Sequence, residues 1–160
     1  MKQIFESKNI RFVEVSEELV PNYLAMVNDY EHVGKLIGGS RKAYTAEQEI
    51  KWVRGKLEKK AVVFSMLEKK TGEFIGNIEL MDVTDSSGEL GIAITAAKQD
   101  LGFGTEAICA MIRYGMDELG LDRISLKAWP YNVRAIHVYE KCGFTEYNRT
   151  SDDVFMEITR

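Results

Sequence analysis

A glycine-bearing turn that opens a helix most constrains how this 160-residue chain folds. The turn is Gln99–Thr105, and it follows the apolar run Glu89–Ile94, which reads as a strand. A helix that begins at such a turn leaves its first backbone N–H groups without partners, aimed at one point. The helix dipole adds partial positive charge at that point. The turn is therefore predicted to bind phosphate oxygens between a strand and a helix.

The glycines of this turn have two other interpretations. Gly102 and Gly104 can simply make a tight turn, because glycine adopts conformations that other residues avoid. Together with Ala107 they also fit the dinucleotide-binding fingerprint, and Asp122 lies downstream. Asp122 precedes its strand, however, whereas the ribose-binding acid of that fingerprint ends one. A P-loop is excluded because no Gly-Lys-Ser/Thr follows the turn.

Length and composition favour one soluble domain spanning residues 1–160. A domain of this size buries enough surface to need no disulfide or metal. The net charge of −4 argues against a general nucleic-acid surface. No apolar run approaches a membrane helix, and the N-terminus lacks a signal-peptide core. Only two cysteines are present, so we expect a protein of the reducing cytoplasm. From the charge and the absence of a long apolar run we expect binding to neither nucleic acid nor membrane.

Hydrophobic periodicity predicts the order β-α-α-β-β-β-α-β-α-β-β, a mixed sheet of the α/β (α+β) class with helices on its faces. Thr45 and Gln48 match a capping box at the second helix, whose apolar stripe is Ile50, Val53 and Leu57. We expect strands at 10–15, 62–67, 74–81, 89–94, 124–128, 144–147 and 154–158. We expect helices at 19–29, from 45, from the glycine turn to 119, and at 132–142.

A second motif places three residues on one helical face. Asn132, Ala135 and Tyr139 are spaced three and four residues apart. An Asn side chain can bind an amide-rich ligand through both its donor and its acceptor, and Ala135 leaves room for a chain lying on the helix. The phenol of Tyr139 suits a general acid that protonates a thiolate. Taken singly, Asn132 can be only a helix cap and Tyr139 only a core aromatic.

These motifs together resemble the GNAT superfamily of acetyl-CoA-dependent N-acetyltransferases, and most nearly its RimJ/RimL-like or spermidine-acetyltransferase-like branch. The resemblance is carried by Gln99-x-x-Gly102-x-Gly104 and by Asn132-x-x-Ala135-x-x-x-Tyr139-Glu140-Lys141-Cys142-Gly143-Phe144. It covers roughly residues 73–147 at motif level, and the N-terminal third matches only in layout. It implies a sheet whose central strands splay apart.

The resemblance also implies a cofactor, acetyl-CoA, and its site. Tyr139 would act as general acid beside the sulfur, Lys98 would add charge toward the phosphates, and no metal is involved. The expected cofactor-binding residues are the strand backbone at Ile92, Ala93 and Ile94, the turn at Gln99, Asp100, Leu101, Gly102, Phe103, Gly104 and Thr105, and the helical residues Asn132 and Ala135. An N–H near Ile92 would stabilise an oxyanion.

The general base remains open among Glu89, Glu79 and water, with Glu89 slightly favoured because it leads into the cofactor strand. Residues 71–97 hold acids and no Lys or Arg, which would attract a cationic amine. The loop 30–44 is expected to cover the acceptor. The acids of this segment are Glu73, Glu79, Asp82, Asp85 and Glu89, of which Asp82 and Asp85 are more simply interpreted as residues of a solvated hairpin.

The predicted function is acetyl transfer to a primary amine, either a small cationic amine such as a polyamine or a peptide N-terminus. The alternative is a non-catalytic acyl-CoA-binding sensor or regulatory module. The cysteines and histidines do not form a zinc pattern. The sequence leaves the oligomeric state open, with a homodimer as one option.

Overall fold

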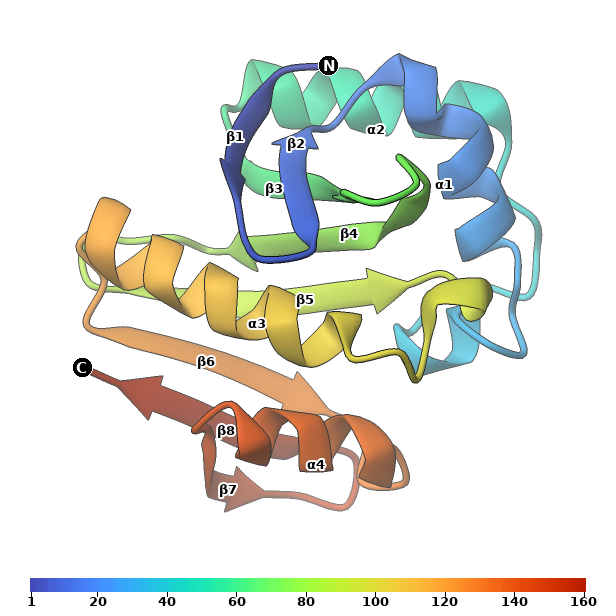
Figure 1. The fold of residues 1–160 in the computed structure, drawn as a ribbon. Helices are drawn as coiled ribbons and strands as arrows, with labels where there is room; N and C mark the ends of the chain where they lie inside the picture. The colour runs from blue at the N-terminus through green and yellow to red at the C-terminus, as the bar shows by residue number, and fades with distance from the viewer.

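The computed structural model describes residues 1–160 and contains one eight-stranded sheet with helices on both faces (Figure 1). This confirms the predicted fold class. The strands are β1 Gln3–Glu6, β2 Ile10–Glu14, β3 Val62–Glu68, β4 Phe74–Met81, β5 Ser87–Ile94, β6 Arg123–Ala128, β7 Thr145–Arg149 and β8 Val154–Thr159. The α-helices are α1 Val20–Val27, α2 Ala46–Glu58, α3 Phe103–Arg113 and α4 Val133–Lys141. No helix combines the length and the apolar character needed to span a bilayer.

The sheet divides at its one parallel pair. The strand order is β1-β2-β3-β4-β5-β6-β8-β7, and every neighbouring pair is antiparallel except β5 and β6. Pairing of β5 with β6 ends at Glu89 opposite Ser125, whereas β5 stays paired with β4 as far as Ile94. The edge of β5 beyond residue 89 is therefore free, and the two strands diverge (Figure 1).

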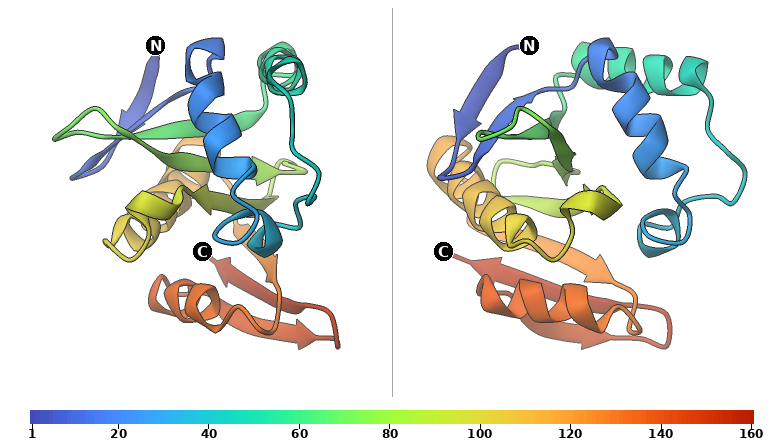
Figure 2. Two further views of the ribbon diagram at one scale, coloured as in Figure 1. Left: turned by 90° about the vertical axis from the view of Figure 1, so that its right-hand side faces the viewer. Right: turned by 45° about the vertical axis from the view of Figure 1, so that its right-hand side comes forward.

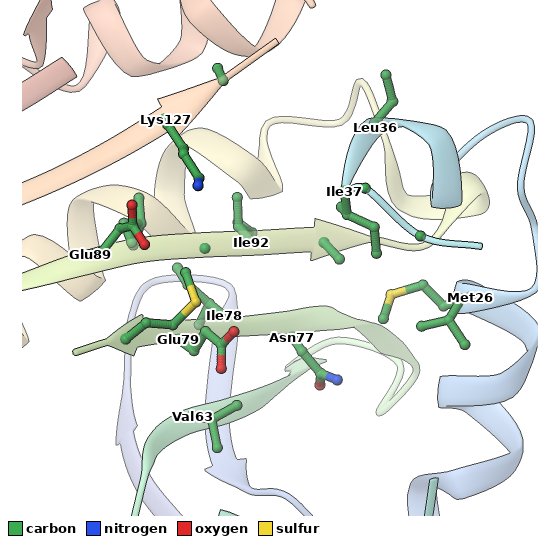
Figure 3. Close-up of a pocket in the computed structure, with 18 of the residues that line it drawn as sticks. Met26, Leu36, Ile37, Val63, Asn77, Ile78, Glu79, Glu89, Ile92 and Lys127 are labelled. Carbon is green, nitrogen blue, oxygen red and sulfur yellow. The ribbon is translucent and has the colours of Figure 1, made fainter. Parts of the chain in front are cut away.

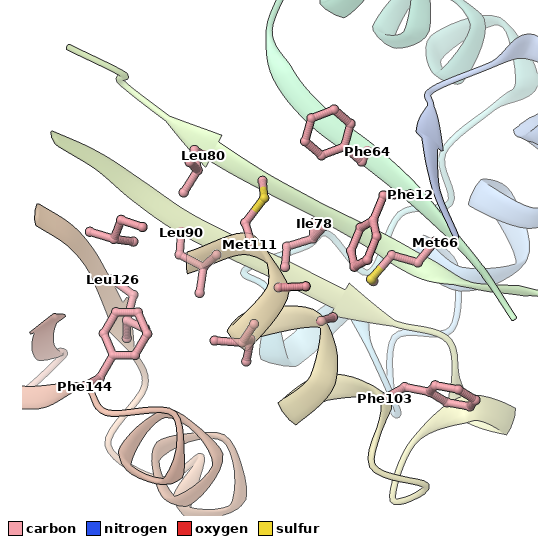
Figure 4. Close-up of a cluster of buried hydrophobic side chains, with 14 of the residues drawn as sticks. Phe12, Phe64, Met66, Ile78, Leu80, Leu90, Phe103, Met111, Leu126 and Phe144 are labelled. Atoms are coloured by element: carbon pink, nitrogen blue, oxygen red, sulfur yellow. The ribbon is translucent and has the colours of Figure 1, made fainter. Parts of the chain in front are cut away.

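Alternating side chains of the central strands feed two hydrophobic clusters on opposite faces. Phe64 and Met66 of β3 belong to the cluster with α3, whereas Val63 and Leu67 pack with α1 and α2. The larger cluster also reaches Phe144 at the end of α4 (Figure 4). Figure 2 shows α1 and α2 on the other side of the sheet from α3. The split between β5 and β6 therefore opens toward both layers of helices.

Local sequence signals explain where the helices begin and end. Thr45 and Gln48 form the predicted capping box at the start of α2. Asn132 caps α4, since its side-chain oxygen accepts from the N–H of Ala135 at 3.3 Å. Gly102 has φ +88°, a left-handed conformation that costs a glycine little and starts α3.

Some elements differ from the expectation. The N-terminal strand β1 was not predicted, because Gln3–Glu6 is short and acquires its extended form from pairing with β2. The stripe expected on α2 is rotated. Val53 is buried as predicted, but Leu57 is exposed and Glu49 takes a buried position instead. Contacts with α1 and the sheet, rather than hydrophobicity alone, decide which face of α2 is covered.

Candidate functional site

The glycine turn presents free backbone donors at the start of α3. The first helical hydrogen bond runs from the N–H of Glu106 to the carbonyl of Gly102 at 3.2 Å. The N–H groups of residues 102–105 therefore have no partner within the helix. Asp100 also adopts a left-handed conformation, with φ +59°, so the chain curls tightly before the helix begins. This geometry suits an anion.

A small cavity of about 190 Å³ lies against this turn, between β5 and the first turns of α4. Most of the residues expected to bind cofactor line it. Leu101 and Phe103 do not: the side chain of Leu101 is exposed and that of Phe103 is buried in the core, so each can contribute only backbone. The lining residues that were expected are Ile92, Ala93, Ile94, Gln99, Asp100, Gly102, Gly104, Thr105, Asn132, Ala135 and Tyr139.

The cap on α4 engages the side chain of Asn132 through one hydrogen bond. Its carbonyl oxygen is occupied by the N–H of Ala135, whereas its amide N–H₂ has no acceptor in the protein. Asn132 can therefore donate to a ligand through its amide N–H₂, and its oxygen keeps a second lone pair that can still accept, so its use of both groups stays a prediction. Ala135 also borders the small cavity, with only a methyl group to fill it.

Tyr139 lies on the same face of α4, one turn beyond Ala135. Its ring packs edge-on against Phe144, with the ring centroids 6.0 Å apart. The hydroxyl makes no hydrogen bond within the protein. Burial raises the pKa of this phenol to about 12, with a smaller contribution from the neighbouring Cys142. The phenol is therefore protonated at any physiological pH and has a hydrogen free to donate.

A large cavity of about 660 Å³ adjoins the small one on the α1 and α2 side of the sheet. Both cavities reach β5 where it has left β6. Figure 3 shows the large cavity between β4, β5 and the segment that carries Leu36 and Ile37. The residues that line both cavities are Leu36, Ile37, Ile92, Ala93, Asn132 and Tyr139. The two cavities therefore meet at the phenol.

Carboxylates line the large cavity in three different environments. Glu79 on β4 is paired with Lys56 of α2 at 3.1 Å. Glu89 is the last residue of β5 that pairs with β6, and no side chain bonds its carboxylate. Glu49 on α2 is only 9% exposed and forms no ion pair, and burial raises the pKa of its carboxyl above the usual value. Lys127 of β6 also lines the cavity, but the carboxylates that line it outnumber this one ammonium group.

Aromatic rings complete the wall around Glu49. Tyr23 of α1 packs edge-on against Trp52, one turn along α2 from Glu49, with centroids 5.7 Å apart. The hydroxyl of Tyr23 hydrogen-bonds to Ser65 at 2.5 Å, so the ring is held in place. Tyr44 and Trp129 face the same space. Aromatic faces and a carboxylate together suit an organic cation.

The structure changes one charge assignment made from the sequence and supports another. Asp82 and Asp85 lie outside the large cavity, which agrees with their interpretation as residues of a solvated hairpin. Lys98 is bound to Glu73 at 3.0 Å and to Glu68 at 3.0 Å, and its side chain is only 14% exposed. Lys98 is therefore not free to meet a phosphate, and that expectation is wrong. The error arises because the partners of Lys98 come from a distant hairpin.

Residues of the loop 30–44 line both cavities, and its predicted position over the acceptor stays a prediction. The carbonyl of His32 accepts from the amide of Gln99 at 3.0 Å, which ties the loop to the glycine turn. The Tyr131 hydroxyl donates to the carbonyl of Lys35 at 3.2 Å, which ties it to the segment before α4. The loop therefore contacts the elements on either side of the split.

Sequence reasoning missed Glu49 and Arg134. The sequence did contain a signal for Glu49. This residue lies one helical turn before Trp52 and Val53, on the apolar face of α2, and a carboxylate on such a face is unusual without a role. Arg134 had no such signal, since its partners lie in the glycine turn. No cluster of His, Cys, Asp or Glu has the composition of a metal site.

A split sheet with a phosphate-type turn on one side and an acidic, aromatic cavity on the other belongs to a protein that brings two ligands together. Residues 9–145 match the family model described as an acetyltransferase (GNAT) domain. The chain belongs to the GNAT acetyltransferase family.

The chain is similar to curated relatives that are N-acetyltransferases by name. It is 30% identical to spermidine N(1)-acetyltransferase of Vibrio cholerae over 93 residues, 57% of this chain and 54% of that protein. It is 34% identical to human alpha/beta-tubulin-N-acetyltransferase 9 over 85 residues, 52% of this chain and 40% of that protein. The matched region thus spans about half the length of these relatives or less.

Solved structures share the whole fold. The Vibrio cholerae spermidine N-acetyltransferase in complex with CoA and spermine superposes with a TM-score of 0.85 at 20% identity, covering 96% of each chain. A GNAT-family acetyltransferase of Bacillus anthracis gives a TM-score of 0.84 at 18% identity, also covering 96% of each chain. At these identities the likeness establishes the fold.

Proposed function

We propose that residues 1–160 act as one acetyl-CoA-dependent N-acetyltransferase unit that moves an acetyl group directly to a primary amine. The observation that carries this proposal is the unpartnered hydroxyl of Tyr139 at the junction of the two cavities. A cofactor in the small cavity and an amine in the large one would meet there. Holding two reactants in such proximity removes much of the entropic barrier to a bimolecular reaction.

The residues around the small cavity fit acetyl-CoA. The free N–H groups of the turn suit a diphosphate, the free N–H₂ of Asn132 suits an amide carbonyl, and the unpaired edge of β5 suits an extended arm. Acetyl-CoA would supply the thioester whose carbonyl the amine attacks. We assign the backbone of Ile92, Ala93 and Ile94 to this arm, as the family resemblance implies.

Tyr139 is proposed to donate its proton to the departing sulfur. Its raised pKa keeps the hydrogen in place before the reaction. A tyrosinate at this position would be a strong base, so it would recover a proton from the acetylated nitrogen as the amide forms. The proton is thus returned, and no covalent intermediate on the enzyme is required.

The amine must first lose a proton as it enters. We retain Glu89 as the proposed base, but at about 3.3 Å per residue it lies roughly 13 Å along β5 from Ala93. It would therefore act through water. Glu79 is the weaker candidate, because its carboxylate is already bound to Lys56.

We propose a cationic amine as the acceptor, with Glu49 as one of its counter-ions. Glu49 borders only the large cavity and has no counter-charge in the protein. Burial raises the pKa of this unpaired carboxyl, so its ionisation is unfavourable in the free protein, and a nearby ammonium group would offset that cost. The name of the Vibrio cholerae relative, a spermidine acetyltransferase, is consistent with this class.

Replacing Glu49 with glutamine is expected to raise KM for a cationic acceptor about tenfold or more, because a charged hydrogen bond contributes roughly 1.5–3 kcal/mol. The Kd for acetyl-CoA should not change, since Glu49 does not border the small cavity. Steady-state kinetics and calorimetry measure the two constants. Glu47→Gln, an exposed change on the same helix, is the matched control.

The same variant should also stabilise the free protein. Burial raises the pKa of Glu49 in the folded state, so its ionisation opposes folding as the pH rises above the unfolded value. Removing that charge should increase the free energy of unfolding at pH 7, measured by urea denaturation. A lower stability together with an unchanged KM would contradict the counter-ion role.

A panel of amines tests the function itself. The protein is incubated with acetyl-CoA and small diamines, polyamines, aminoglycosides or peptides with free N-termini, and thiol release is followed. We expect turnover with cationic amines. Tight binding of acetyl-CoA without turnover of any amine would instead favour the non-catalytic acyl-CoA-binding module.

A further inference from the structure

Arg134 of α4 reaches across the small cavity to the glycine turn. Its guanidinium donates to the two carboxylate oxygens of Asp100 at 3.1 and 3.0 Å, and to the side-chain oxygen of Gln99 at 3.0 Å. All three residues line the small cavity. The pair therefore joins the two walls between which the proposed cofactor would lie.

The presence of Asp100 in this turn requires an explanation. A carboxylate beside a diphosphate is unfavourable, and the turn otherwise presents only donors. Two residues of the Lys or Arg type line the small cavity, Arg134 and Lys98. Lys98 is already bound to Glu68 and Glu73. Arg134 is therefore the one strong cation there that an incoming phosphate can recruit.

The Arg134–Asp100 pair is well placed to exchange partners. The side chains of Arg134 and Asp100 are 52% and 69% exposed, and exposed ion pairs of this kind contribute little to stability. Only one terminal nitrogen of Arg134 donates to Asp100, whereas a phosphate can accept from two guanidinium nitrogens at once, with the neighbouring N–H groups already aimed at it. The exchange thus gives up a weak interaction and gains a stronger one.

We propose that Arg134 leaves Asp100 when the cofactor binds and then donates to the diphosphate. In the free protein Asp100 holds the guanidinium at the small cavity, and it competes with the ligand for that guanidinium. This inference rests on the proposed acetyl-CoA site. Asp100 then acts as a placeholder that lowers cofactor affinity, and Arg134 is a cofactor-binding residue outside the turn.

Calorimetric binding of three ligands tests the assignment. CoA carries a diphosphate and a 3′-phosphate, dephospho-CoA keeps only the diphosphate, and pantetheine has neither. Arg134→Gln should weaken CoA and dephospho-CoA about tenfold and leave pantetheine unchanged. Lys141→Gln, an exposed cation at the far end of α4, should change none of them.

Asp100→Asn separates partner exchange from simple neutralisation. It should tighten CoA binding several-fold when Arg134 is present, and less in the Arg134→Gln background, where no guanidinium remains to be released. Equal gains in both backgrounds would mean that the guanidinium stays on Asp100, which would overturn the exchange.

Other outcomes also decide the matter. An Arg134→Gln effect on CoA but not on dephospho-CoA would assign Arg134 to the 3′-phosphate, and no effect on either would remove it from the site. Arg134→Lys, which keeps the charge but not the fork, should fall between glutamine and wild type. Failure of wild-type protein to bind CoA would instead refute the proposed function.

Discussion

Replacing Tyr139 with phenylalanine is expected to lower kcat by about 10²–10⁴-fold, the usual contribution of a positioned general acid. The ring would keep its edge-on contact with Phe144, so the fold and the Kd for acetyl-CoA should be preserved. Stopped assays of thiol release give kcat, and calorimetry gives Kd. An unchanged kcat would eliminate the phenol as acid.

Tyr147→Phe is the matched control for this variant. Tyr147 of β7 is exposed and lies outside both cavities. Its loss should alter kcat little. The pH profile adds a second check. Because burial raises the pKa of Tyr139 to about 12, wild-type kcat should not fall through phenol ionisation between pH 7 and 10.

Replacing Gly104 with valine is expected to raise the Kd for CoA at least 100-fold. Gly104 borders the small cavity within the first turn of α3, so a branched side chain would occupy the place where the diphosphate approaches the free N–H groups. A fluorescence or calorimetric titration with CoA measures the loss. Undiminished affinity would place the diphosphate elsewhere.

The fold should tolerate this change. A Cβ at Gly104 meets only the terminal methyl of Ile94, at 3.3 Å, which is the end of a flexible side chain. Gly55→Val, in the middle of α2 where a Cβ meets nothing within 4 Å, reproduces the cost of valine in a helix away from both cavities. Both variants should unfold at similar urea concentrations, and only Gly104→Val should lose CoA.

The parts of the site that were predictable are those whose geometry depends on near neighbours in the chain. The spacing of Asn132, Ala135 and Tyr139 fixes their common face on any helix, and the cap at Asn132 follows from its side chain. The capping box at Thr45 was likewise correct. The sequence could not reveal that the cap uses one lone pair of the Asn132 oxygen and leaves its N–H₂ unpartnered in the protein.

The charges of the site were harder to assign. Lys98 lies next to the glycine turn in sequence, yet its partners Glu68 and Glu73 come from a hairpin more than twenty residues away. Glu49 belongs to α2, and it reaches the large cavity only because α2 packs on the sheet beside α1. Which carboxylates are paired and which are free is thus set by strand and helix neighbours.

By itself, the sequence determined the local features: the helix ends, the glycine turn with its free donors, and the phenol one turn from Ala135. Each depends on hydrogen bonds or spacings within a few residues. The resemblance implied that the central strands splay, but only the tertiary structure decided that β5 leaves β6 at Glu89, that both cavities border Tyr139, and that Arg134 is held by Asp100. These features depend on pairings between distant segments, whose register and burial arise only when the whole sheet assembles.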